Sequence, residues 1–259
     1  MKISFIGSGR VATHFAKQLK QIGHHIHQIY SPKNAEKLAK EVCACAVTQL
    51  ELLDSAVDIV IIAVSDQAIE SVAQALPKSF QEVCIVHTSG STDLSVLSKY
   101  QQKSGVLYPL QTFSFEKDVN WAELPILIEG NTIQAFELIE QLANSLSKKV
   151  FHYSSKQRLS LHLAAVFACN FSNYCYDLAH QLTDTAAIDF GLLHPLILET
   201  ALKATQFAPH AVQTGPAKRH DQNILNMHRA LLAEQGHESA LAVYDLLSQQ
   251  IQKQHPKPE

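Results

Sequence analysis

Compact apolar runs alternate with helical patterns over the first 150 residues of the chain. Ile3–Ile6, Asp58–Val64 and Val83–His87 are short continuous runs, typical of strands that are covered on both faces. In Val11–Ile22 and Gln67–Leu76, apolar residues recur every three or four positions, which predicts helices. The pattern predicts further strands at 25–30, 105–108, 125–129 and 149–152, and helices at 34–42 and 132–146. This alternation predicts a parallel, doubly wound α/β sheet.

Strand patterns stop after Tyr153. Helices are predicted over 154–187, 192–207, 222–234 and 238–253, so we expect a sheet domain at 1–153 and an all-helical domain at 154–259. The stretch Leu159–Leu202 holds only four charged residues, and a helix this apolar should be buried around most of its circumference. We therefore expect it to form the spine of the helical domain and the interface of a homodimer.

A glycine-rich turn joins the first strand to the first helix. Gly7-Ser8-Gly9-Arg10-Val11-Ala12 has the form G-x-G-x-x-A. Gly7 permits a tight turn, Gly9 lets a pyrophosphate approach the backbone, and Ala12 allows close packing of helix on strand. The free N–H groups at the helix start favour an anion. In this strand–turn–helix setting the motif predicts a Rossmann-type dinucleotide site, the alternative being a similar fold that has lost its cofactor.

The residues after the second strand favour NADP over NAD. An NAD site usually carries an acidic residue about 20 positions beyond the glycines. Here the strand ends at Tyr30, and the first acidic residue of the chain is Glu36. Ser31 could donate to a 2′-phosphate, and Lys33 and Arg10 could neutralise it. Alternatively, Lys33 is only a solvated residue at a helix start.

Small residues follow two further strands, at Ala63-Val64-Ser65 and at Thr88-Ser89. Ligands of such sheets bind outside the carboxyl ends of the strands, so these residues are expected to contact the ribose or the nicotinamide carboxamide. The alternative is ordinary turn chemistry, with the hydroxyl groups capping helices.

Four polar residues of the helical half are candidates for catalysis and substrate binding. His162, Val166 and Asn170 recur every four residues and would share a helical face. His162 is the candidate proton donor or acceptor, with Asn170 as its polar partner; both could instead bond neighbouring helices. Thr214 and Arg219, in a turn between helices, are candidate substrate ligands, although Arg219 could also be a solvated residue at a helix start.

Composition narrows the function classes further. The 259 residues carry a net charge of −3, which argues against a nucleic-acid-binding protein, and no apolar run reaches the roughly 18 residues that span a bilayer. Five scattered cysteines and no signal peptide indicate reduced thiols and a cytoplasmic location. His24, His25 and His27 suggest a metal, but no nearby cysteine or acid completes a tetrahedral set, so none is expected.

At this point the chain resembles the Rossmann-like proteins that end in a helical DUF2520 domain, a family described as NADP oxidoreductases. The resemblance rests on the glycine-rich turn and on four further segments: 86–91 (VHTSGS), 108–113 (YPLQTF), 160–171 (SLHLAAVFACNF) and 213–217 (QTGPA). More distantly, the layout is similar to pyrroline-5-carboxylate reductases, F420-dependent NADP reductases and β-hydroxyacid dehydrogenases. The resemblance implies an NADP site in the first domain and a helical domain that often dimerises.

The sequence departs from the β-hydroxyacid dehydrogenases, which place a lysine and then an asparagine on the first long helix of the second domain. No lysine follows Lys156 on that helix, so His162 would take its place. The leading hypothesis is an NADP-dependent oxidoreductase that moves a hydride to or from a small polar metabolite, a carbonyl or an imine, in the crevice between the domains. The alternative is an NADP-binding sensor or regulatory protein without turnover.

Overall fold

The computed structural model describes residues 1–257, which form two compact units. The first unit spans Met1–Cys169 and the second begins at Asn170. The predicted domain boundary after Tyr153 coincides with the end of the strands, whereas the two units divide within the helical stretch that follows.

The first unit is built on one sheet, which has eight strands among the described residues, in the order β3-β2-β1-β4-β5-β6-β7-β8. The strands are β1 Lys2–Ile6, β2 His25–Tyr30, β3 Cys45–Val47, β4 Ile59–Ile62, β5 Cys84–His87, β6 Ser104–Pro109, β7 Ile126–Gly130 and β8 Val150–His152. From β3 to β6 all neighbours are parallel, with β1 at the point where the strand order reverses. The doubly wound Rossmann-type fold predicted from the sequence is confirmed.

One pair of strands departs from the expected parallel sheet, because β7 runs antiparallel to β6. Residues 110–125, which join them, contain only the single 3₁₀ turn Trp121–Glu123. Without a crossover helix the chain re-enters the sheet at the edge where it left it, which produces an antiparallel neighbour. A helix then follows β7, and β8 is again parallel to β7.

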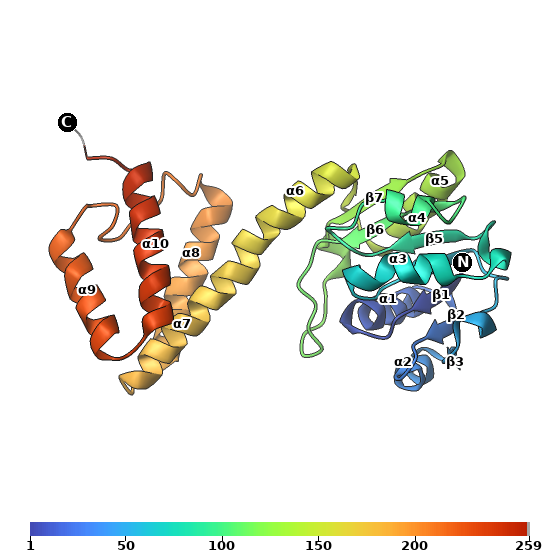
Figure 1. Ribbon diagram of the computed structural model, residues 1–259, viewed down its shortest axis with the longest axis horizontal. Helices are drawn as coiled ribbons and strands as arrows, with labels where there is room; N and C mark the ends of the chain where they lie inside the picture. The colour runs from blue at the N-terminus through green and yellow to red at the C-terminus, as the bar shows by residue number, and fades with distance from the viewer. Residues whose placement is uncertain (258–259) are drawn as a thin grey trace. The chain divides into compact units, whose positions relative to one another are not determined.

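Helices cover both faces of the sheet (Figure 1). α1 Arg10–Gln21, α2 Ala35–Val42 and α5 Ile133–Leu146 pack on one core, while α3 Asp66–Ala75 and α4 Ser95–Ser98 pack on the other. Strand β4 shows why a continuous apolar run is needed: Ile59 and Ile61 enter the first core, and Val60 and Ile62 enter the second. Further 3₁₀ turns lie at Leu50–Leu52, Lys78–Phe80 and Phe190–Leu193.

The helical part begins with α6 Ser155–Ala165, followed directly by the π-helix Val166–Phe171 and by α7 Ser172–Thr185. The single long helix predicted over 154–187 is thus interrupted by a wider turn. Because a π-helix bonds residue i to i+5, the expected α-helical face with a spacing of four does not continue through Val166–Phe171. The remaining helices are α8 His194–Gln206, α9 Gln222–Glu234 and α10 Glu238–Gln254.

The second unit has a small core. Its α9 and α10 lie side by side (Figure 1), and Leu178, Leu232 and Ala240 form the buried cluster. By contrast, α8 has no buried residue, and Leu196, Leu198 and Leu202 keep 55–63% of their surface exposed. The expected burial of this apolar stretch is therefore not observed for α8 within a single chain.

No helix among residues 1–257 combines the length and the apolar character that a membrane crossing requires.

Candidate active site

The turn after β1 is tight enough to require glycine. Gly7 has a φ of +114°, and a Cβ there would lie 2.3 Å from the Ala63 carbonyl oxygen. Its N–H donates to the Tyr30 carbonyl at 2.8 Å, which ties the turn to the end of β2. Helix α1 follows with no side-chain cap and no acidic residue in its first turn. Its free N–H groups are thus open to an anion such as a pyrophosphate.

The predicted cofactor residues meet around one cavity of about 490 Å³ at the carboxyl ends of the parallel strands. Its lining consists of Gly7, Ser8, Gly9, Arg10, Val11, Ser31, Ala63, Val64, Ser65, Asp66, Thr88 and Ser89. Four strand ends, those of β1, β2, β4 and β5, thus contribute to one site. Tyr30 does not line this cavity, because its side chain packs against the core under α3 and only its carbonyl meets the turn.

Lys33 lines a neighbouring cavity of about 580 Å³ between α1 and α2. Ser8 belongs to both cavities. The cavity between α1 and α2 is also lined by Lys37 and Lys17, and Lys17 pairs with Glu41 at 2.7 Å. Lys33 and Lys37 form no salt bridge within residues 1–257, and two such lysines next to a glycine-rich turn suit the 2′-phosphate of NADP, so the residues present fit this cofactor.

At the end of β5, His87 is fully buried in its neutral form. Its Nδ1 accepts a hydrogen bond from the Ser89 N–H at 3.2 Å, whereas its Nε2 has no hydrogen-bond partner among the described residues. Burial, assisted by the charge of Arg158, lowers the pKa of His87 to about 3. The side chain therefore fixes the loop that carries Thr88 and Ser89, and it does not titrate near neutral pH.

His162 meets a partner that the sequence analysis missed. Its Nδ1 lies 3.1 Å from the Tyr108 hydroxyl group, at the end of β6. Both side chains press on Gly90, where a Cβ would lie 2.6 Å from His162 Nδ1 and 2.7 Å from Tyr108 Cζ. Burial raises the pKa of Tyr108, which keeps the phenol protonated. Gly90 directly follows Ser89, which lines the cofactor cavity.

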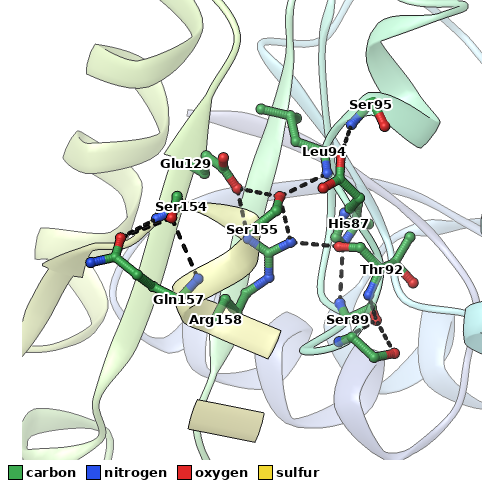
Figure 2. A network of polar contacts seen from close by, with 12 residues as sticks. His87, Ser89, Thr92, Leu94, Ser95, Glu129, Ser154, Ser155, Gln157 and Arg158 are labelled. Carbon is green, nitrogen blue, oxygen red and sulfur yellow. Dashed lines mark hydrogen bonds and ion pairs between the residues drawn. The ribbon is translucent and has the colours of Figure 1, made fainter. Parts of the chain in front are cut away.

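A polar network fixes the helix that carries His162 (Figure 2). Arg158, only 1% exposed, binds Glu129 of β7 at 2.7 Å and the Thr92 carbonyl. Ser155 donates to Glu129 at 2.7 Å and accepts from the Leu94 N–H at 3.0 Å. Both residues sit in the first turn of α6, one turn before His162.

The other predicted site residues, Asn170, Thr214 and Arg219, belong to the second unit. Asn170 lies in the π-helix, and all three are exposed. Their roles stay predictions.

The histidines around residue 25 have other partners. His24 lies 3.2 Å from the N-terminal amine, and His27 pairs with Asp54 at 2.8 Å. In the part of the chain that the structure describes, no three His, Cys, Asp or Glu side chains gather in a way that could hold a metal.

Two family matches cover most of the chain. Residues 2–90 match the family "NADP oxidoreductase coenzyme F420-dependent", and residues 124–251 match the domain of unknown function DUF2520. No curated protein gives a match.

Solved structures extend the likeness over the full length. The chain is 36% identical to a "putative NADP oxidoreductase" from Bacteroides fragilis, with a TM-score of 0.91 over 97% of this chain and 98% of that one. A protein from Thermotoga maritima is 23% identical, with a TM-score of 0.77 over 98% and 100% of the two chains. A reductive aminase from Aspergillus terreus, solved with NADPH and ethyl-5-oxohexanoate, shares the fold at 16% identity, with a TM-score of 0.76 over 100% and 96%.

Three observations point to the same dinucleotide cofactor: the glycine-rich turn, the cavity at the strand ends and the two family matches. The chain therefore belongs to the family of NADP oxidoreductases in which a DUF2520 domain follows the dinucleotide-binding part, and NADP is its cofactor.

Proposed function

We propose that this protein is a reductase that transfers a hydride from NADPH to a small polar imine or carbonyl compound. The observation that carries the proposal is the Tyr108–His162 pair, which meets at 3.1 Å and contacts Gly90, the residue after Ser89 of the cofactor cavity. A hydride acceptor of this kind needs a proton at its nitrogen or oxygen, and a histidine–phenol pair can provide one.

The proton would come from the Tyr108 hydroxyl group. Its raised pKa keeps it protonated, and its buried position allows little competition from water. His162 then returns a proton to the phenol through the same hydrogen bond, because one imidazole nitrogen can donate a hydrogen bond while the other accepts one. NADPH, when bound, would supply the hydride. The balance is one hydride and one proton added across the C=N or C=O bond.

We favour the imine over the carbonyl, because the chain shares its fold with imine reductases as well as with a reductive aminase. An imine nitrogen takes up a proton more readily than a ketone oxygen, so an imine demands less of the acid, which suits a site without a lysine donor. Asn170, Thr214 and Arg219 remain proposed substrate ligands, and Arg219 would suit a carboxylate.

Turnover with a defined panel tests the proposal. The protein is mixed with NADPH and with cyclic imines, ketones plus amines, or ketones alone, and NADPH oxidation is followed. We expect oxidation with a subset of the imines. Tight NADPH binding without oxidation by any compound would overturn the reductase and favour a sensor that holds NADP.

Substitutions at His162 and Tyr108 test whether these two residues donate the proton. His162→Ala should lower kcat by about 10²–10⁴-fold while the Kd for NADPH stays unchanged. Tyr108→Phe should act in the same way, because it removes only the hydroxyl group. His25→Ala, at an exposed position of β2, is the matched control and should behave as the wild type. If His162→Ala abolished NADPH binding together with the fold, the histidine would be structural.

We also propose that the protein works as a homodimer through its second unit. The exposed leucines of α8 are costly in water and would be covered by a second copy. We further propose a cytoplasmic location, because the five cysteines are free thiols, three of them exposed at Cys43, Cys45 and Cys169.

A further inference from the structure

The loop 110–125, which joins β6 to β7, lies against the helix that starts at the glycine-rich turn. His14 Nε2 of α1 donates to the Ser114 carbonyl at 2.7 Å, and the His14 ring contacts Phe113 at 5.2 Å between ring centroids. Phe113 also approaches Trp121, which packs edge-on against Phe15 of α1. The loop is thus fixed to α1 at Phe113 and Ser114.

The next residue, Phe115, takes no part in these contacts between the loop and α1. Its side chain is 61% exposed, which is costly for a large apolar ring unless it has a task. The ring lines the cavity that contains Lys33 and Lys37. The Arg10 guanidinium lies over it, 5.9 Å from the ring centroid, in cation–π contact.

Arg10 is otherwise free to bind an anion. Within residues 1–257 it forms no salt bridge with a carboxylate, and it lines the cofactor cavity next to Ser31. A flexible arginine loses conformational entropy when it binds a phosphate. A ring that already holds the guanidinium in place removes part of that cost.

We propose that Phe115 is a positioning residue that holds Arg10 for the 2′-phosphate of NADP, and that the loop 110–125 thereby helps to select NADP over NAD. Phe115 does not bind the phosphate itself; Arg10 does, together with Ser31 and Lys33. The inference rests on the NADP cofactor and not on the proposed reaction.

Binding of two fragments by calorimetry tests the inference without any turnover. The fragment 2′,5′-ADP carries the 2′-phosphate, and ADP lacks it. In Phe115→Ala the Kd for 2′,5′-ADP should rise about two- to fivefold, the range expected for an exposed cation–π contact. The Kd for ADP should change less than twofold. Phe115→Trp should restore binding, because indole holds cations well.

A double-mutant cycle separates positioning from general damage. In an Arg10→Ala background, Phe115→Ala should have no further effect on 2′,5′-ADP. His14→Ala should weaken 2′,5′-ADP selectively, by less than Phe115→Ala, because it loosens the anchor at Ser114. Ile133→Ala, another exposed apolar residue at 74%, is the control and should change nothing.

Equal weakening of 2′,5′-ADP and ADP by Phe115→Ala would overturn the inference, because the ring would then contact a part common to both. An unchanged Kd for 2′,5′-ADP, or a full effect of Phe115→Ala without Arg10, would overturn it as well. None of these outcomes depends on whether imines or carbonyls are reduced.

Discussion

At the scale of single residues, burial and hydrogen-bond partners determine what each polar side chain can do. His87 and His162 both contact the loop that follows β5, at Ser89 and Gly90, yet only His162 is hydrogen-bonded to a titratable side chain, Tyr108. His87 is kept neutral by burial, while Tyr108 is kept protonated by the same effect. Among the cations, Arg10 and Lys33 face the cavities, and neither has a carboxylate partner within residues 1–257.

Lys33→Ala should weaken NADPH about fivefold and leave NADH unchanged. The reason is the loss of one partly exposed charge-assisted contact to the 2′-phosphate, worth about 1 kcal/mol. Fluorescence titration with both cofactors checks this. Lys40→Ala, an exposed lysine of the following helix α2 that lies outside the cavity, is the control. Equal affinities of Lys33→Ala and wild type for NADPH would show that Lys33 is only a solvated residue at a helix start.

His87 should make the folded state sensitive to mild acid. Its pKa of about 3 in the folded protein lies below the ordinary value near 6.5, so between these values only the unfolded chain takes up the proton. Its contribution is full above pH 6.5 and is lost as pH falls toward 3, at about 1.4 kcal/mol per pH unit.

Urea unfolding at several pH values between 7 and 4.5 measures this slope. His87→Asn cannot take up a proton, so its stability should fall less steeply with acid than that of the wild type, whatever its stability at pH 7. Parallel curves for the two proteins would refute the role of His87.

At the scale of elements, the sequence predicted most strands and helices but not how they bend or turn back. Apolar runs and the glycine-rich turn specify β1, α1 and β4 locally. The antiparallel β7 depends on a connection without a helix, and the π-helix Val166–Phe171 lies inside an apolar stretch whose pattern predicts an ordinary α-helix, so neither was predicted.

Tyr108 was missed because it reads as the last apolar residue of a strand. The sequence did hold a signal for a site residue, because Tyr108 carries a hydroxyl group at the carboxyl end of a buried strand. This is the same edge of the sheet as Thr88 and Ser89. The gathering of Thr88, Ser89 and Ser65 with Gly7 around one cavity could be predicted, because parallel strands end at one edge.

Arg158→Met should destabilise the first unit by about 2–3 kcal/mol. The substitution leaves the Glu129 carboxylate, 22% exposed, with only the Ser155 hydroxyl group and removes the partner of the Thr92 carbonyl, so the cost lies at the lower end of that for a broken buried pair. Chemical denaturation gives the value. Lys156→Met, an exposed position two residues earlier on α6, is the control. A loss no larger than that of the control would mean that Arg158 does not anchor α6.

At the scale of the whole molecule, only 17% of the residues are charged, and the second unit exposes apolar side chains where charged ones would be usual. Its exposed leucines predict a homodimer, so light scattering should give about twice the chain mass of 28.7 kDa. Leu196→Glu with Leu198→Glu should shift the mass toward the monomer, whereas Leu52→Glu, an exposed leucine of the first unit, should not. A monomeric wild type would contradict the proposal and leave the leucines of α8 unexplained.

The most direct test of the proposed reaction site is a crystal structure with NADPH bound. We predict the pyrophosphate on the N–H groups that follow Gly7 and the nicotinamide ring beside Gly90. The Tyr108 hydroxyl group, bonded to His162, should then face the nicotinamide C4 across a space for one small substrate. A nicotinamide ring turned away from Tyr108 and His162 would contradict the proposed proton donor.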